Sequence, residues 1–333
     1  MRSRQANTAR VKFRSLANSL VLAAALAVGV RTAAQQAAGS PPSDEPPLRL
    51  SPTEIELYKR AKTLIDWTPQ RIESIPLLHK LHPAENQDEL PAILERVGKT
   101  AVALYHDFPK IACDEEVYSE TSLKNPIAPG GGMGRNDTVR QFRYIIIPKL
   151  AGDIPAFDEY RTDTKGRPVD IARLANLKMI TSKFTSTWTY FSPSELPDSR
   201  FRYLGTQSIQ RRECYVVGFA QKPEARSVSG FRVGDDAAAA ALLVQGFAWI
   251  DEQSFEILKI ETWLLARRTD IGLDAEYTIV NHSPVRPAGF DRVLWLPHDV
   301  TVTILYRGAY FRNTHRYSKF KLFRVESTIK PVE

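Results

Sequence analysis

The chain has 333 residues, of which 43% are hydrophobic, 10% aromatic and 25% charged. This composition is that of an ordinary globular protein, and it excludes a wholly disordered chain, a collagen-like repeat and a polytopic membrane protein. The net charge of +7 does not indicate nucleic-acid binding, because residues 1–34 hold six basic and no acidic side chains and leave only +1 for the rest. We therefore expect no nucleic-acid partner.

Residues 1–34 have the pattern of a secretory signal peptide. Five basic residues precede an apolar run of 11 residues at 20–30, and small residues follow up to Ala34. The run is too short to cross about 30 Å of hydrocarbon. An uncleaved anchor is the alternative, since Leu16 and Ala17 would lengthen the apolar segment. We predict cleavage near Ala34 and an exported, periplasmic protein that is soluble after cleavage.

Residues 35–50 are rich in Pro, Ser, Gln and Ala and contain no aromatic residue. Such a segment buries too little apolar surface to offset the entropy of ordering it. It is therefore predicted to be a flexible tether between the signal peptide and the folded part.

Residues 51–86 are predicted to be an additional helical segment. Ser51, Pro52 and Glu54 combine an N-cap, a proline at the first helical position and an acid at the third. A second, shorter helix starts at Thr68-Pro69 and is broken by Pro76. A third helix begins near residue 86 and opens the predicted main domain, 87–333. Its apolar side chains fall on one stripe that needs a partner surface: Leu90, Ile93, Leu94, Val97, Ala101 and Leu104.

From residue 110 onward the pattern changes to β-strands. Residues 299–304, for example, alternate Val and Ile with Asp and Thr, so that one face is apolar. The predicted strands lie at 142–147, 160–166, 185–191, 201–204, 214–219, 246–250, 255–265, 299–304 and 317–329. About ten strands at hairpin spacing, with one short helical segment between residues 168 and 179 and loop insertions at 125–137 and 223–245, argue against a βαβ fold. We predict an α+β fold: a large curved antiparallel sheet, or incomplete β-barrel, covered by N-terminal helices.

The two cysteines, Cys113 and Cys214, both lie in β-type sequence. In an exported chain a cysteine pair is often bridged, and this bridge would close a loop of roughly 100 residues, worth at most about 4.7 kcal/mol. Two buried free thiols on separate strands are the alternative. We predict the disulfide.

The search for catalytic and metal-binding motifs gives no site. The glycines of residues 130–134 lack the spacing of a dinucleotide loop and the Lys-Ser/Thr pair of a P-loop. His79 and His82 have no acidic residue between them to complete a zinc motif. The acidic run at 114–116 is read as a solvated strand end, and no Gly-x-Ser-x-Gly sequence is present. We expect no cofactor, no metal and no enzymatic activity.

The C-terminal half resembles the lipoprotein-localisation (LolA/LolB-like) group, which includes outer-membrane lipoprotein-sorting proteins. The resemblance lies in the sequences at 201–205, 214–219, 246–251, 255–260 and 294–297, and above all in a Gly-apolar-Trp-Ile-Asp-turn-Phe-x-Ile hairpin. It implies an incomplete antiparallel barrel closed by helices over an apolar cavity, and a non-enzymatic carrier of acylated proteins. The chain departs from that group in its helices at 51–82 and its two insertions.

A half-closed sheet has a concave face that its own side chains do not fill, so the helix at 87–106 is expected to cover it. If the cover is partial, an apolar cavity remains that accepts acyl chains of a lipid or lipidated partner. The alternative is that the same side chains form a plain core and the fold serves as an envelope protein interaction or sensor module. A hydrolase that uses His282, His298 or His315 is a third hypothesis. The candidate cavity residues are Trp188, Tyr190, Trp249, Ile257, Trp263 and Trp295.

Overall fold

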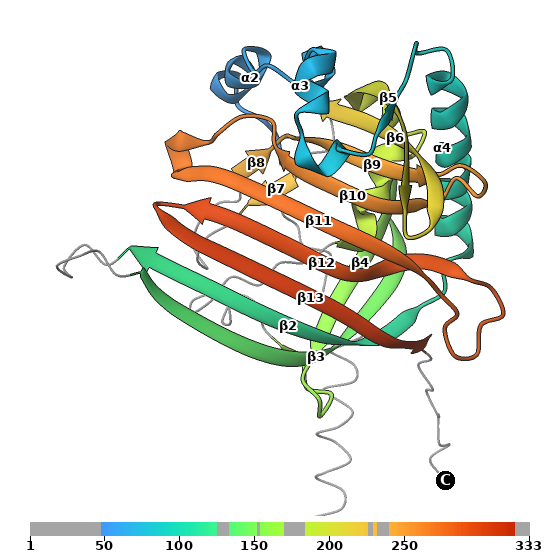
Figure 1. The fold of residues 1–333 in the computed structure, drawn as a ribbon. Helices are drawn as coiled ribbons and strands as arrows, with labels where there is room; N and C mark the ends of the chain where they lie inside the picture. Colours follow the sequence, from blue (N-terminus) through green and yellow to red (C-terminus); the bar gives the residue numbers. More distant parts are fainter. Residues whose placement is uncertain are drawn as a thin grey trace, which may run out of the picture. The chain divides into compact units, whose positions relative to one another are not determined.

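One large antiparallel sheet dominates the fold (Figure 1). The computed structural model describes residues 48–124, 133–151, 154–169, 184–225, 229–231 and 240–323. Eleven strands pair in the order β1-β5-β6-β9-β10-β11-β12-β13-β2-β3-β4. Because β1 and β4 stand at opposite ends of this order, the sheet is not closed into a barrel. The predicted α+β fold with an incomplete antiparallel barrel is confirmed.

The strands vary from two to 19 residues in length. β7 and β8 form a separate two-stranded sheet. The bounds of the strands are β1 His82–Pro83, β2 Ile111–Lys124, β3 Met133–Ala151, β4 Ile154–Thr162, β5 Ser199–Ile209, β6 Arg212–Gln221, β7 Ser229–Phe231, β8 Ala240–Leu242, β9 Val244–Asp251, β10 Ile257–Leu264, β11 Leu273–Val285, β12 Leu294–Tyr306 and β13 Ala309–Leu322.

The helices are short, apart from α4. Ser51 caps α2 as predicted: its Oγ accepts a hydrogen bond from the Glu54 amide at 3.3 Å, and Glu54 Oε2 accepts one from the Ser51 amide at 2.6 Å. Thr68 caps α3 in a similar way. The bounds of the helices are α2 Pro52–Lys59, η1 Leu64–Asp66, α3 Pro69–Glu73, η2 Pro76–Leu78, α4 Leu90–Asp107, η3 Phe184–Phe191, η4 Leu196–Asp198 and η5 Thr269–Ile271.

Several segments differ from the sequence prediction. The predicted loop insertion at 223–245 contains β7 and β8, and the last strand begins at Ala309 instead of residue 317. Residues 185–191, predicted as a strand, form the 3-10 helix η3, whose Phe191 is fully buried. The strand β11 was not predicted, because its polar residues interrupt the alternation. Residues 133–137 belong to β3 and not to a loop, whereas 125–132 and the helix expected within 168–179 lie wholly or mainly outside the described residues.

The two faces of the sheet carry separate apolar clusters. On the outer face, Val216 and Phe247 pack with Leu64, Ile72 and Leu78 from the segment between α2 and β1. The inner face carries the alternate residues of the same strands, and it packs against α4 and η3. This inner cluster includes Ile93, Val97 and Ala101 of α4 with Phe191, Val217, Phe219, Ala248, Ile250 and Ile260.

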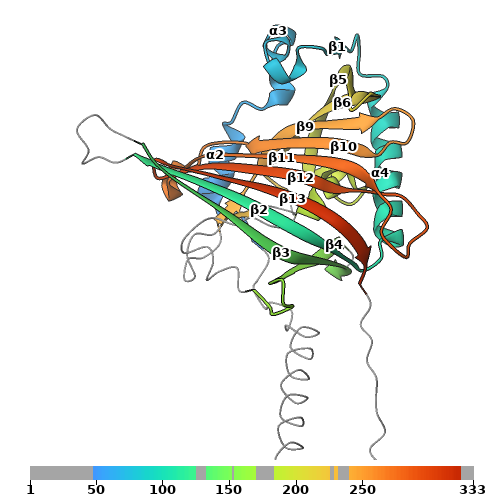
Figure 2. The same ribbon diagram turned by 60° about the horizontal axis from the view of Figure 1, so that its bottom comes forward.

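Helix α4 runs across the strands, near the ends of β9, β10 and β11 (Figures 1 and 2). Its start is fixed by the pairing of β1 with β5, where Gly205 has a φ of +130° and a side-chain carbon would lie 1.9 Å from the His82 carbonyl oxygen. Gly98 allows close packing of α4 on the segment after η3, since a side-chain carbon there would lie 3.2 Å from the Phe191 oxygen. Gly205 and Gly98 therefore both allow α4 to pack closely against the inner face.

The predicted disulfide between Cys113 and Cys214 is not formed, and both thiols are free and buried. Cys113 on β2 belongs to the inner cluster, whereas Cys214 on β6 belongs to the outer one. The two strands are also separated by β9, β10, β11, β12 and β13 in the sheet. A disulfide needs Cα atoms within about 7 Å, so this geometry excludes the bridge.

Candidate functional site

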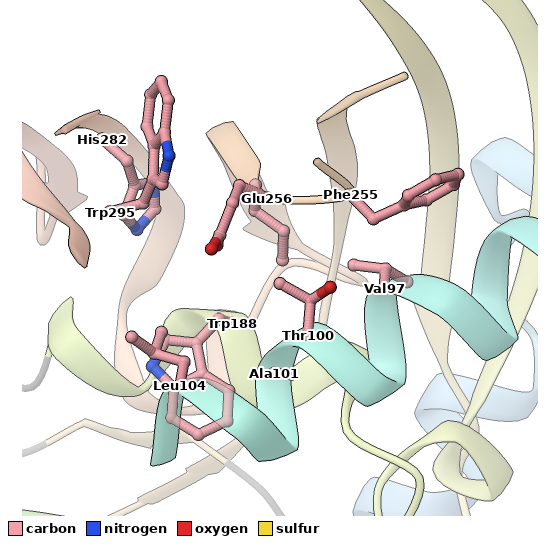
Figure 3. Close-up of a pocket in the computed structure, with 10 residues that line it drawn as sticks. Val97, Thr100, Ala101, Leu104, Trp188, Phe255, Glu256, His282 and Trp295 are labelled. Carbon is pink, nitrogen blue, oxygen red and sulfur yellow. The ribbon is translucent and has the colours of Figure 1, made fainter. Parts of the chain in front are cut away.

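The candidate site is a small cavity between α4 and the inner face of the sheet (Figure 3). Its volume is about 10 Å³, which is roughly the space that one water molecule requires. In this structure the cavity is therefore closed to an acyl chain. Its lining comes from α4, η3, the β9–β10 turn, β11 and β12, and consists of Val97, Thr100, Ala101, Leu104, Trp188, Phe255, Glu256, Ile257, His282 and Trp295.

The β9–β10 turn places Phe255 and Glu256 at the cavity. Asp251 holds the turn, because its Oδ1 accepts hydrogen bonds from the Ser254 amide at 2.7 Å and the Ser254 hydroxyl at 2.8 Å. Arg212 fixes the same carboxylate from β6 at 2.6 and 2.8 Å. Phe255 adopts a φ of +57°, a conformation that usually requires glycine. The turn thus holds an aromatic side chain at the cavity despite a strained backbone.

Phe255 is also held from its two sides. Its ring stacks on Tyr215 with a centroid distance of 5.9 Å, and the Arg96 guanidinium of α4 lies 5.0 Å from the ring centroid. The contact joins α4 to the β9–β10 turn through a cation–π interaction. Next to Phe255, burial and the charge of Asp251 raise the pKa of Glu256 to about 7. Glu256 is therefore partly protonated at neutral pH.

His282 reaches the cavity from β11, beside a register shift between Asn281 and His282 in the pairing with β12. Its side chain is 3% exposed, and within the described part of the chain its ring makes only a weak contact with the Leu258 carbonyl and no well-aligned hydrogen bond. Burial lowers the pKa of His282 to about 4, and the nearby Leu258 carbonyl only partly offsets this effect. The ring is therefore neutral at pH 7. Trp188 Nε1 is likewise buried without a hydrogen-bond acceptor among the residues described.

The structure brings three of the six predicted cavity residues together. Trp188, Ile257 and Trp295 line the cavity. Tyr190 packs on the inner cluster, with its ring centroid 5.1 Å from that of Phe219, and it does not line the cavity. Trp295 also packs against the outer cluster, and the Arg212 guanidinium lies 5.5 Å from its ring centroid.

Trp249 and Trp263 lie on the outer face, away from the cavity. Trp249 Nε1 donates a hydrogen bond to Gln207 Oε1 at 2.8 Å, and Trp263 stacks on Trp67 with a centroid distance of 6.3 Å. Both side chains are covered by the segment that contains η1, α3 and η2. Strand alternation thus places Trp249 and Trp263 on the outer face, against which Trp295 also packs.

The sequence reasoning missed the polar members of the cavity. Glu256 was read only as part of a predicted strand, and His282 was considered only as a hydrolase candidate. The available signal for Glu256 was its place after the Asp-Glu-Gln-Ser turn, where a hairpin presents its first side chains. His282 lies in β11, which was not predicted as a strand. The residues around it therefore did not indicate which face of the sheet it occupies.

A second group of polar side chains is buried on the inner face, where side chains of β13, β2 and β4 converge across β3. Arg161 forms a bidentate ion pair with Glu115, with distances of 2.5 and 2.7 Å, and both side chains are at most 1% exposed. His315 Nδ1 lies 2.9 Å from the same carboxylate. Burial alone would raise the pKa of Glu115, but these two hydrogen-bonding partners lower it to about 2. The prediction of a solvated strand end at 114–116 is therefore wrong for Glu115, which is buried within β2. We call Glu115, Arg161 and His315 the paired cluster.

A wider hollow of about 420 Å³ lies on the outer face of β12, β13, β2 and β3. Its charges are balanced across the strands, because Arg312 is opposite Glu120 and Arg316 is opposite Glu116 in the β13–β2 register. Such cross-strand pairs stabilise a sheet and leave no net charge to attract an ion. This hollow therefore has the character of a solvated sheet surface.

Two further observations concern the described residues as a whole. No helix among them is long and apolar enough to cross a membrane. Within the same ranges, no three His, Cys, Asp or Glu side chains are grouped in a way that would hold a metal ion.

No protein-family model matches the chain, and no curated protein matches it. Among solved structures, the chain is similar to a DUF1329 family protein from Desulfovibrio piger, with 10% identity and a TM-score of 0.36 over 72% of this chain and 95% of that one. It is also similar to a domain described as an outer membrane lipoprotein-sorting protein from Vibrio parahaemolyticus, with 14% identity and a TM-score of 0.34 over 69% and 91%.

A third similar structure is the lipoprotein LppX of Mycobacterium tuberculosis, with 10% identity and a TM-score of 0.21 over 73% of this chain and 98% of that one. Because all three TM-scores are below 0.5, our interpretation of the site depends on this chain's own strands and side chains.

Proposed function

We propose that this protein is a non-catalytic envelope protein that binds an acyl chain, from a lipid or a lipidated protein, between α4 and the inner face of the sheet. The observation that supports it most is the arrangement itself: α4 covers the apolar inner cluster of an open sheet, and a cavity remains between the two. Export through the predicted signal peptide at 1–34, and the tether at 35–50, belong to the same proposal.

Binding requires α4 to move, because the cavity of about 10 Å³ does not admit a chain of methylenes. The side chains of α4 that are fully buried on its apolar stripe are Ile93, Val97 and Ala101. Exposing them costs roughly 5 kcal/mol, whereas an acyl chain of about ten methylenes gains about 8 kcal/mol on burial. The exchange of helix contacts for ligand contacts is therefore energetically accessible.

The closed cavity favours one other function. If α4 stays in place, the inner cluster is an ordinary hydrophobic core. The fold then serves as an envelope module for protein interaction or sensing, without a lipid ligand. The predicted contact surface is then the tether and the helical segment 51–82.

A reversible lock on α4 tests the proposal. A side-chain carbon at Gly98 would lie 3.4 Å from Pro193 Cγ, so a cysteine pair made by Gly98→Cys and Pro193→Cys is placed to form a disulfide. Pro193 follows Phe191, which packs on Phe201 and Phe219 of the sheet. The disulfide therefore joins α4 to a segment that is anchored in the core.

We expect the oxidised double variant to lose at least tenfold in affinity for the methyl ester of a dansyl-labelled undecanoic acid, measured by dansyl fluorescence. Dithiothreitol should restore the affinity, so that the reduced form of the same protein is the control. The wild type should not respond to dithiothreitol, because its two thiols are already free. Equal uptake by the locked form contradicts movement of α4, and absence of uptake by the wild type favours the interaction module.

A further inference from the structure

Two polar side chains that line the cavity are buried and not fully hydrogen-bonded. Trp188 is 4% exposed and its Nε1 lacks a hydrogen-bond partner among the described residues, while His282 is 3% exposed and its ring has only a weak contact with the Leu258 carbonyl. A buried polar group without a partner costs about 1–3 kcal/mol. Trp188 and His282 line the same small cavity, so a ligand in it can supply the hydrogen bonds that these two side chains lack.

Glu256 adds a third polar side chain to the same space. Figure 3 shows it extending between Trp295 and His282 on one side and the α4 side chains Thr100 and Leu104 on the other. The indole offers a donor, and a neutral imidazole or a protonated carboxyl offers both a donor and an acceptor. No Lys or Arg is found among the described residues that line the cavity. This set of groups suits an uncharged oxygen and lacks a cation that would balance a carboxylate.

The size of the cavity agrees with one small polar group. A volume of about 10 Å³ accommodates a single oxygen atom in the position of a water molecule. The surrounding lining is apolar, from Val97, Ala101, Leu104 and Ile257. An acyl chain would therefore lie against these side chains. One oxygen atom of the group that attaches the chain to its carrier would then occupy the space beside Trp188, His282 and Glu256.

We propose that Trp188 and His282 select acyl chains attached through an ester or amide carbonyl, in preference to free fatty acids and plain hydrocarbons. The carbonyl oxygen accepts hydrogen bonds from Trp188 Nε1 and from a His282 ring nitrogen, and replaces the water that the cavity accommodates. This inference rests on the proposed function, because it specifies the ligand class of the same site.

The test compares methyl laurate, laurate and tridecane as competitors of the dansyl probe, since the three have hydrocarbon chains of similar length. The wild type should bind the ester about tenfold or more tightly than tridecane, the factor that corresponds to about 1.4 kcal/mol. His282→Phe and Trp188→Phe should each remove most of this preference and leave the affinity for tridecane within about twofold. His298→Phe is the matched control, because His298 is 51% exposed and pairs with Asp299.

The possible outcomes separate the two proposals. If neither the probe nor any competitor binds, the proposed function is wrong. If the probe binds but ester, acid and hydrocarbon compete equally, acyl binding stands and only the selectivity is wrong. Retention of the ester preference in both Phe variants also contradicts the assignment to Trp188 and His282, whereas loss of all binding in His298→Phe would show that the control histidine matters instead.

Discussion

The inner face of the sheet buries polar side chains in two places, which differ in how well these side chains are hydrogen-bonded. In the paired cluster, Glu115 is held by Arg161 and His315 at hydrogen-bonding distance. In the cavity under α4, Trp188 Nε1 has no partner within the described residues and the His282 ring has only a weak contact with the Leu258 carbonyl. Satisfied buried charges fix a structure, whereas unsatisfied buried groups mark a place that another molecule completes. The comparison therefore contrasts a cluster held by its own ion pair with the cavity at which we propose binding.

The largest effect is expected in the paired cluster. Arg161→Leu leaves the Glu115 carboxylate buried with only His315 beside it and should lower the free energy of unfolding by about 3–5 kcal/mol. Urea unfolding measures this loss. Arg167→Leu is the matched control, because Arg167 forms an ion pair with Asp163 while its own side chain is 74% exposed, and it should cost at most about 1 kcal/mol. Similar losses for the two variants would remove the contrast on which the comparison depends.

A smaller effect is expected on the pH dependence of the free energy of unfolding when the cavity residues Glu256 and His282 are substituted. The two substitutions should change it in opposite directions. The pKa of Glu256 is raised from 4.5 to about 7, so its contribution to stability is full below about pH 4.5 and is lost as the pH rises to about 7. The pKa of His282 is lowered from 6.5 to about 4, so its contribution is full above about pH 6.5 and is lost as the pH falls to about 4. The two contributions oppose each other in the wild type.

Each substitution should expose the other residue's contribution. Relative to the wild type, His282→Phe should lose stability as the pH rises from about 4 to 6.5, and Glu256→Gln should gain stability between about 4.5 and 7. Urea unfolding midpoints at four pH values between about 4.5 and 7.5 measure both. Parallel curves for wild type and variants would show that these groups titrate normally and are not buried in solution.

The smallest effect concerns the strained residue at the edge of the cavity. Phe255→Ala and Phe255→Gly both remove the ring that contacts Tyr215 and Arg96. Only glycine adopts the φ of +57° without strain, so Phe255→Gly should be the more stable of the two by about 1 kcal/mol. Thermal unfolding compares them directly. If Phe255→Ala were the more stable variant, the turn would not hold this conformation in solution.

Much of the fold followed from local pattern. The alternation at 299–304 gave the strand β12 and its buried face, with Val300, Val302 and Ile304 all inside. The capping residues gave α2, and the apolar stripe gave α4 as the cover of the sheet. These features depend on neighbours within a few residues, which a sequence shows directly.

The site was less accessible, because it depends on which face of the sheet each strand turns inward. Trp249 and Trp263 looked equivalent to Trp188 in sequence, yet the packing of residues 64–78 makes the outer face apolar as well. The same ambiguity led to the predicted disulfide, since Cys113 and Cys214 lie on opposite faces. At 185–191, aromatic and β-branched residues favour a strand, but the packing of Trp188 and Phe191 under α4 selects a 3-10 helix instead.

The pairing of β2 with β13 has a consequence for how the chain folds. Ser119 and Asn313 are hydrogen-bonded at 2.9 Å although 194 positions separate them in sequence. β3 and β4 join the sheet only through β2, so all three early strands depend on the last one. Contacts of such long separation form late and slowly. A chain that is shortened before β13 should therefore leave β2, β3 and β4 without a place in the sheet, and assembly of this part has to wait for the C-terminal end to arrive.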